Sequence, residues 1–206
     1  ALWLSAYYLS PIGEVVSCMI PSGKKETGAS SFSLLQDETE FEQKTLSDEQ
    51  QKAVKEILSE AKRFYHYLYG MTGSGKTEVF LSVAEEILKR GKGVIYLVPE
   101  IGLTPQVIKS VVKRFGNTVA VLHSELTPNQ KLGEWNRILK KEARIVIGAR
   151  SAIFAPIPDL GLIIIDEEHD SSYKAGSSPR YHARQVAMYR ALKQKIPLLM
   201  GSATPS

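Results

Sequence analysis

The stretch Gly70-Met71-Thr72-Gly73-Ser74-Gly75-Lys76-Thr77 has the spacing of a phosphate-binding loop: a glycine, four residues, and then Gly-Lys-Thr. Its three glycines lack a Cβ, so the backbone can adopt positive φ and approach a phosphate chain closely. The lysine would reach the terminal phosphates, and the threonine hydroxyl would bind Mg²⁺. We therefore expect a nucleoside triphosphate with Mg²⁺ to contact Gly70, Gly73, Ser74, Gly75, Lys76 and Thr77.

Both flanks of this loop favour the same interpretation. Residues 64–69 are rich in aromatic side chains and predict a strand. Residues 76–90 carry apolar residues at helical spacing and are followed by Gly91, which predicts a helix with a defined end. A loop that joins a strand to a helix N-terminus can bind anions, because backbone amides and the helix dipole point toward it. The alternative, a chance glycine turn, does not explain why both flanks match.

From residue 47 onward, predicted strands alternate with predicted helices. Helices are expected at 48–63, 76–90, 105–115, 128–140 and 181–195, and strands at 64–69, 94–98, 119–122, 144–147, 162–165 and 198–200. The strands are almost entirely apolar, which predicts an α/β domain with a mostly parallel sheet and helices on both faces. Residues 1–21 predict a short extended unit with a strand at 14–20. Residues 22–46, rich in Ser, Gly, Lys and Glu, predict a linker.

The composition limits the class of protein. With 206 residues, 43% of them hydrophobic and 23% charged, the chain is typical of a globular protein. A single cysteine, Cys18, excludes an internal disulfide and a cysteine zinc site. No apolar run is long enough to span a membrane, so we expect a cytoplasmic protein without a membrane partner. Residues 47–206 carry 7 more basic than acidic residues, which suggests a polyanionic partner.

Polar residues follow two of the predicted strands, at the edge of a parallel sheet where ligands bind. Asp166 and Glu167 come after the strand at 162–165. In an ATPase, the aspartate would hold the Mg²⁺ shell and the glutamate would polarise the attacking water; the alternative is a solvated acidic turn. Ser202 and Thr204 come after the strand at 198–200, and their hydroxyls can link the acidic pair to a moving element.

Gln50 precedes the loop and has two candidate roles. Its amide offers a donor and an acceptor, which suits the edge of an adenine. It also stands three residues after Ser47, which is the spacing of a capping box at the start of the helix predicted at 48–63. The sequence leaves both roles open.

Three further segments carry residues that suit a strand of nucleic acid. Residues 99–106 and 148–152 follow predicted strands and offer hydroxyl, amide and guanidinium groups to phosphates, although ordinary caps and turns have the same composition. In residues 170–184, aromatic residues next to basic ones can stack on bases, or pack against the next helix. The candidates for DNA binding or coupling are Thr104, Gln106, Arg150, Ser151, Tyr173, Lys174, Arg180, Tyr181, Ser202 and Thr204.

Together these motifs resemble the first motor domain of a superfamily-2 helicase, and more closely the PriA family of bacterial replication-restart helicases (primosomal protein N′). The resemblance is carried by residues 70–80, 98–106, 122–124, 147–154, 166–174, 180–184 and 201–205. The runs Pro99-Glu-Ile-Gly-Leu-Thr-Pro-Gln106 and Asp166-Glu-Glu-His-Asp-Ser-Ser-Tyr-Lys174 are the most specific. Residues 3–21 resemble the end of that family's N-terminal DNA-binding module, so residues 1–21 are expected to be its remnant.

The resemblance implies a RecA-like P-loop domain at 47–206 and an ATP-driven 3′-to-5′ DNA helicase. Such an enzyme acts on forked or single-stranded DNA, restarts stalled replication forks, and has other primosome proteins and single-strand-binding protein as partners. It implies catalytic roles for Lys76, Asp166 and Glu167, Mg²⁺ binding by Thr77 and Asp166, and adenine contact by Gln50. The family's second motor domain and its zinc module would lie beyond this chain. We therefore expect this chain alone to hydrolyse ATP weakly or not at all.

Two other functions stay open. The chain could belong to a nucleotide-gated DNA-binding or scaffold module, or to a double-strand DNA translocase that does not unwind. The basic excess of residues 47–206 is compatible with each of them. Strand displacement by the full-length protein is the property that separates unwinding from both.

Overall fold

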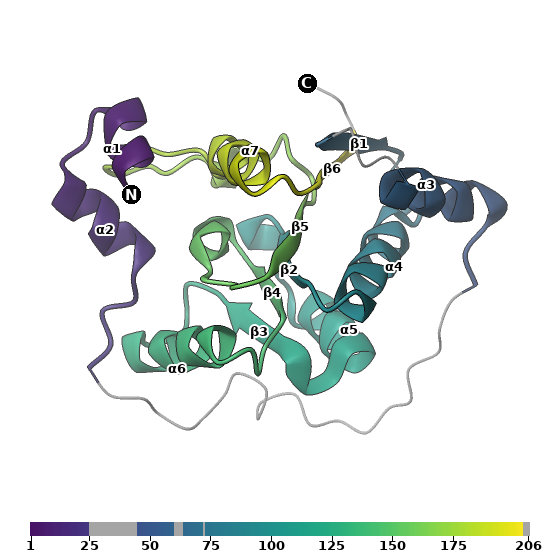
Figure 1. Cartoon of the computed structure of the whole chain (residues 1–206), viewed down its shortest axis with the longest axis horizontal. Helices are drawn as coiled ribbons and strands as arrows, with labels where there is room; N and C mark the ends of the chain where they lie inside the picture. Colours follow the sequence, from purple (N-terminus) through teal and green to yellow (C-terminus); the bar gives the residue numbers. More distant parts are fainter. Residues whose placement is uncertain (25–44, 60–63, 72, 204–206) are drawn as a thin grey trace.

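Six parallel strands form a single sheet in the order β1-β6-β5-β2-β4-β3 (Figure 1). The computed structural model describes residues 1–24, 45–59, 64–71 and 73–203. The sequence-based prediction of an α/β fold with a parallel sheet is confirmed. None of the helices in the described residues is long and apolar enough to cross a lipid bilayer.

The strand positions agree with the sequence-based prediction to within two residues at each end. The strands are β1 (Tyr65–Tyr69), β2 (Gly93–Leu97), β3 (Val119–Leu122), β4 (Ile145–Gly148), β5 (Leu160–Ile165) and β6 (Leu198–Ser202). The helices are α1 (Leu2–Tyr8), α2 (Ile12–Met19), α3 (Asp48–Ser59), α4 (Lys76–Lys89), α5 (Pro105–Phe115), α6 (Pro128–Leu139) and α7 (Ala183–Gln194). Residues 60–63, the end of the helix predicted from residue 48, lie outside the described residues.

Local chemistry sets the ends of the helices beside the sheet. At the start of α5, the Thr104 hydroxyl accepts a hydrogen bond from Val107 N at 3.4 Å, and a proline occupies the first helical position. The same helix ends at Gly116, whose φ of 60° a Cβ would disfavour. At the start of α6, Thr127 and Gln130 form a complete capping box.

The sheet is buried on both faces. In β2, Val94 and Tyr96 point into an apolar cluster with α4 and α5, whereas Ile95 and Leu97 point into a second cluster with α6 and α7. This alternation is the period of two that a strand imposes on its side chains. Figure 1 shows α3, α4 and α5 on one side of the sheet and α6 and α7 on the other. Strands covered on both sides present functional groups only at their ends.

The N-terminal residues are helical, so the strand predicted at 14–20 is wrong. The adjacent valines at 15 and 16 favoured a strand in the sequence. However, Val15 is fully buried and Met19 packs against the same apolar cluster, and this spacing of four residues places both on one face of a helix. Pro11 stands at the N-cap of α2, and Glu14 lies in its first turn, where a negative charge is favourable.

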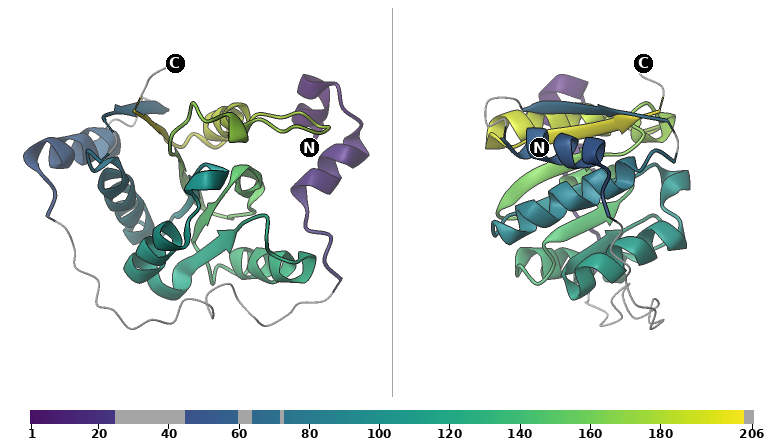
Figure 2. Two further views of the ribbon diagram at one scale, coloured as in Figure 1. Left: turned by 180° about the vertical axis from the view of Figure 1, so that it is seen from behind. Right: turned by 90° about the vertical axis from the view of Figure 1, so that its right-hand side faces the viewer.

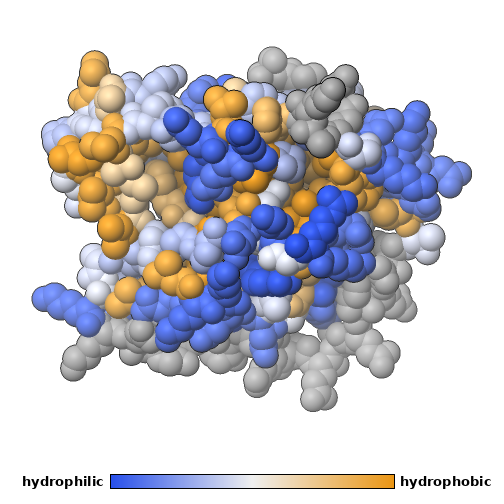
Figure 3. All heavy atoms as spheres, in the orientation of Figure 1, coloured by the Kyte–Doolittle hydropathy of each residue, from blue (hydrophilic) through white to orange (hydrophobic). Residues whose placement is uncertain are grey.

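These two helices pack on the α7 side of the domain. Leu4 of α1 is 3% exposed and, with Val15, belongs to the cluster that contains α6 and α7. Figure 2 shows α1 and α2 beside the segment that leads into α7. Their outer surface is apolar (Figure 3), with Leu2, Leu9 and Ile20 all more than half exposed.

Candidate functional site

The predicted phosphate-binding loop connects β1 to α4. Gly73 and Gly75 have φ angles of 82° and 83°, in the left-handed region that favours glycine. Gly75 is also the N-cap of α4, and because it has no side chain, no side-chain cap occupies the first amides of the helix. A Cβ on Gly70 would come within 2.7 Å of Ser74 Oγ, so a side chain at this position would require Ser74 to move. The result is a tight turn that leaves a helix N-terminus accessible to an anion.

Lys76 lies across this loop and is only 8% exposed. Its Nζ donates to Gly70 O at 2.7 Å and to Met71 O at 3.3 Å, and it lies 3.6 Å from Glu167 Oε1. Phosphate oxygens carry more charge than these carbonyls and make stronger hydrogen bonds with an ammonium. The lysine is therefore placed where an anionic group bound by the loop would attract it.

Asp166 follows β5 and is fixed by several hydrogen bonds. Its Oδ1 accepts from Glu167 N at 3.0 Å, and its Oδ2 accepts from Tyr96 Oη at 3.1 Å. Its main-chain carbonyl accepts from Tyr173 Oη at 2.7 Å. Burial raises the pKa of the Asp166 carboxyl, and the nearby Glu167 charge raises it further. A bound cation would offset this cost and favour the charged form.

Glu167 has an unusual backbone conformation, with a φ of 43°. For a residue with a side chain, this left-handed region costs about 1 kcal/mol or more, and such strain concentrates at functional sites. The carboxylate lies between two groups: Oε1 is 3.6 Å from Lys76 Nζ, and Oε2 accepts from Ala203 N at 3.2 Å. The structure therefore places the acidic turn directly against the phosphate-binding loop.

Strand β6 joins these two segments because it lies between β1 and β5. Gly70 N donates to Ser202 O at 3.3 Å, and Glu168 N donates to Gly201 O at 2.9 Å. Ser202 is fully buried, and its Oγ lies 2.7 Å from His169 Nδ1. Ser202, the last residue of β6, therefore contacts the acidic turn through His169, whereas Thr204 lies outside the described residues. A link from these hydroxyl residues to a moving element stays a prediction.

Gln50 performs the capping role and also contacts the loop. Ser47 N donates to Gln50 Oε1 at 3.0 Å, and Gln50 N donates to Ser47 Oγ at 3.3 Å, which completes a capping box. At the same time, Gln50 Nε2 donates to Ser74 O at 3.2 Å. One amide group therefore connects the start of α3 to the phosphate-binding loop, and its contact with adenine stays a prediction.

The two contacts of Gln50 can be separated by substitution. Gln50→Glu keeps an acceptor for Ser47 N but loses the donor to Ser74 O, so nucleotide affinity should fall about 5-fold. Gln50→Ala removes both contacts and should cost about 1 kcal/mol more in the free energy of unfolding. Nucleotide titration and urea denaturation measure the two effects. Gln51→Glu, whose amide contacts Leu46 O instead, is the matched control and should leave nucleotide affinity unchanged.

The residues of this site fit a nucleotide with Mg²⁺. The loop offers positive-φ glycines and a helix N-terminus for phosphates, and Thr77 and Asp166 offer oxygen ligands, of which Asp166 is hydrogen-bonded to Tyr96 Oη. Within the described residues, no group of three or more His, Cys, Asp or Glu side chains could hold a metal ion by itself. Mg²⁺ binds to one or two protein groups together with phosphates, and Thr77 and Asp166 can supply those protein groups.

The candidates for DNA contact fall into two groups. The exposed ones are Gln106, Ser151, Lys174 and Arg180. The others are engaged in the fold: the Thr104 hydroxyl caps α5, and Arg150 Nη1 donates to Ser172 O at 3.0 Å and to Lys174 O at 2.7 Å. For Thr104 the structure favours the helix-cap alternative. Arg150 holds the segment after the acidic turn in place.

Tyr173 and Tyr181 are only 0% and 4% exposed, so this structure favours the alternative in which these aromatic side chains pack inward rather than face a base. Tyr173 lies under the acidic turn and is bonded to the Asp166 carbonyl. Tyr181 packs against Phe154, with ring centroids 4.9 Å apart, and burial raises its pKa to about 12. The sequence could not distinguish an aromatic residue that faces solvent from one that packs inward. A coupling role for Tyr173 stays a prediction.

Two sets of residues at this site were not predicted from the sequence. One is Tyr96, whose hydroxyl is bonded to Asp166; a polar group within an otherwise apolar strand was the available signal. The other is a buried ion pair in which Arg184 Nη1 lies 2.6 Å from Glu168 Oε2, and the Glu168 side chain is 2% exposed. Tyr67 Oη donates to the other carboxylate oxygen, Glu168 Oε1, at 3.0 Å. This second set ties β1, the acidic turn and α7 together, and it depends on tertiary contacts that no sequence pattern reveals.

Comparison with known proteins agrees with this arrangement. Residues 47–206 match the family model of the DEAD/DEAH box helicases. The chain is 53% identical over 206 residues to the replication restart protein PriA of Treponema pallidum, which covers 100% of this chain and 31% of that protein. It is 52% identical over 164 residues to the PriA of Bacillus subtilis, which covers 78% of this chain and 20% of that protein.

A similar fold occurs in the solved structure of RecG bound to a three-way DNA junction. The TM-score is 0.60 and the sequence identity 26%, over 79% of this chain and 21% of that one. This chain spans less than a third of the length of either PriA protein. The family match covers every described element from α3 to β6, including the phosphate-binding loop and the acidic turn. The chain belongs to the DEAD/DEAH box helicase family and is a PriA-type member of it.

Proposed function

We propose that this chain is the ATP-binding motor domain of a 3′-to-5′ DNA helicase that restarts stalled replication forks. The observation that carries the proposal is the 3.6 Å approach of Lys76 Nζ to Glu167 Oε1, which unites the phosphate-binding loop with the acidic turn. The similarity to PriA proteins supports replication restart as the process. Such a motor would act on the chromosome, in the cytoplasm.

Each residue has a role that its position supports. Lys76 would bind the terminal phosphates, and Gln50 would hold the loop through Ser74 O while its amide reaches toward adenine. Thr77 and Asp166 would hold Mg²⁺, which when bound neutralises phosphate charge. Glu167, whose position is fixed by its backbone and by Ala203 N, would orient and polarise the attacking water.

DNA is the proposed polymeric partner, in forked or single-stranded form. The exposed candidates Gln106, Ser151, Lys174 and Arg180 would contact its phosphates. Tyr173 would transmit movement of its segment to Asp166 through their 2.7 Å hydrogen bond. Other primosome proteins and single-strand-binding protein are proposed as further partners of the whole protein. Zinc would belong to a part of that protein outside this chain, because Cys18 is the single cysteine here.

A strand-displacement assay tests the proposal on the full-length protein. The substrates are partial duplexes with either a 3′ or a 5′ single-stranded tail, and ATP is compared with a non-hydrolysable analogue. We expect unwinding with ATP but not with the analogue, and only of the substrate that has the 3′ tail. Unwinding from the 5′ tail would contradict the polarity. ATP hydrolysis without any displacement would favour a double-strand translocase, and nucleotide binding without turnover would favour a scaffold.

A further inference from the structure

Tyr96 is a polar residue in a fully buried strand. The other residues of β2 are Gly93, Val94, Ile95 and Leu97, and all five are buried. The Tyr96 ring is 1% exposed and packs edge-on to Phe80 of α4, with centroids 6.1 Å apart and an interplanar angle of 65°. A hydroxyl in such a place is costly unless it finds hydrogen-bond partners.

The partner of this hydroxyl is a carboxylate of the nucleotide site. Tyr96 Oη donates to Asp166 Oδ2 at 3.1 Å, and the other carboxylate oxygen, Oδ1, accepts from Glu167 N at 3.0 Å. Tyr96 lies in β2 and Asp166 directly follows β5, which is paired with β2 in the sheet. The two hydrogen bonds therefore hold the Asp166 carboxylate at both of its oxygens.

The direction of this hydrogen bond follows from donor and acceptor chemistry. A phenol has one O–H to donate and an ionised carboxylate can only accept, so the Tyr96 proton points to Asp166. Each carboxylate oxygen has more than one lone pair, so a single hydrogen bond to each oxygen leaves lone pairs that are available to a cation.

We propose that Tyr96 is a positioning residue for the metal, which holds the carboxylate of Asp166 in the orientation that presents its oxygen lone pairs to Mg²⁺. This inference rests on the proposed ATP- and Mg²⁺-dependent function. Tyr96 itself would touch neither the nucleotide nor the metal. Outer partners of this kind change metal affinity about 10- to 100-fold when they are removed.

The test is a Mg²⁺ titration of nucleotide binding by the full-length protein carrying Tyr96→Phe, which keeps the ring and removes the hydroxyl. A fluorescent N-methylanthraniloyl ATP analogue reports binding without turnover. We expect the affinity for this analogue in EDTA to stay within about 2-fold of the unsubstituted protein, and the Mg²⁺ concentration for half-saturation to rise about 10-fold. The Mg²⁺ concentration that gives half-maximal ATPase activity should rise by the same factor.

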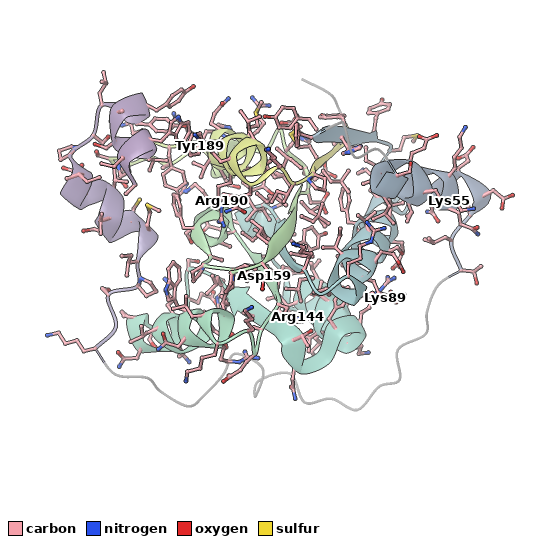
Figure 4. All side chains as sticks on the ribbon, viewed as in Figure 1. Lys55, Lys89, Arg144, Asp159, Tyr189 and Arg190 are labelled. Atoms are coloured by element: carbon pink, nitrogen blue, oxygen red, sulfur yellow. The ribbon has the colours of Figure 1, made fainter. Side chains whose placement is uncertain are left out.

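Tyr189→Phe is the matched control, because it removes a tyrosine hydroxyl from α7 (Figure 4). The Tyr189 ring stacks on Trp3, with ring centroids 4.0 Å apart. It should leave the Mg²⁺ titration unchanged. An unchanged titration for Tyr96→Phe would overturn the inference, and so would an equal loss of binding with and without Mg²⁺ or a variant that does not fold. If the unsubstituted protein bound the analogue without any Mg²⁺ dependence, the proposed function would fail instead.

Discussion

Lys76→Ala is expected to lower ATP turnover of the full-length protein about 10²- to 10³-fold, the usual effect of removing one charge-stabilising donor. The ammonium is held at the loop by Gly70 O and Met71 O and is 8% exposed, so it is already in place for the phosphates. Strand displacement should be lost together with turnover. The fold should persist, because water can replace the ammonium at the two carbonyls.

Steady-state ATPase assays with single-stranded DNA present measure this effect. Lys89→Ala is the control: it lies on the same helix (Figure 4), but its side chain is 60% exposed and pairs with Glu85 and Glu86. Surface pairs of this kind contribute at most about 1 kcal/mol, so turnover should stay within about 2-fold. Full unwinding by the Lys76→Ala variant would show that the loop does not power the protein.

Arg184→Met should destabilise the fold by about 3 kcal/mol, since breaking a buried ion pair leaves the remaining charge uncompensated. The remaining charge is Glu168, which is 2% exposed and would keep the hydrogen bond from Tyr67 Oη at 3.0 Å but no neutralising cation from Arg184. We place the effect at the lower end of the usual range because the Arg184 side chain is 35% exposed. Water can therefore reach part of the space that the guanidinium leaves.

Urea denaturation of the single and double variants measures this loss. Adding Glu168→Gln to Arg184→Met removes the buried charge and should recover about half of the lost stability. Arg180→Met, at a nearby exposed position, should change the free energy of unfolding by less than about 0.5 kcal/mol. A double variant as unstable as Arg184→Met alone would attribute the loss to packing of the arginine stem.

The sequence predicted the sheet well because its strands are buried on both faces. Runs such as 162–165 contain only large apolar residues, and few structures other than a central parallel strand bury four of them in succession. Proline and glycine indicated the helix ends, for example Pro105 at the start of α5 and Gly116 just after its end. The N-terminal strand prediction failed because Val15-Val16 has high strand propensity, and tertiary burial of one face overrode it.

The sequence predicted the segments that form the nucleotide site, but not the hydrogen bonds that support them. Because a parallel sheet brings strand ends to one edge, the loop at 70–77 and the acidic turn were expected to meet, and Lys76 does approach Glu167. The inner supports were not predicted: Tyr96 and Tyr173 both bond to Asp166 from elements distant in sequence. Hydrophobicity patterns report how deeply a residue is buried but not which polar partner it finds there.

The position of β6 in the sheet affects the order in which the chain can fold during its synthesis. Among the described strands, β1 pairs with β6 alone, with Tyr65 opposite Leu198, although β1 is made first and β6 last. A ribosome adds about 5–20 residues per second, so the phosphate-binding loop leaves it roughly 7–25 s before the strand that completes its sheet edge. Until then Gly70 lacks its bond to Ser202 O, and the nascent chain has no assembled site at which to consume nucleotide.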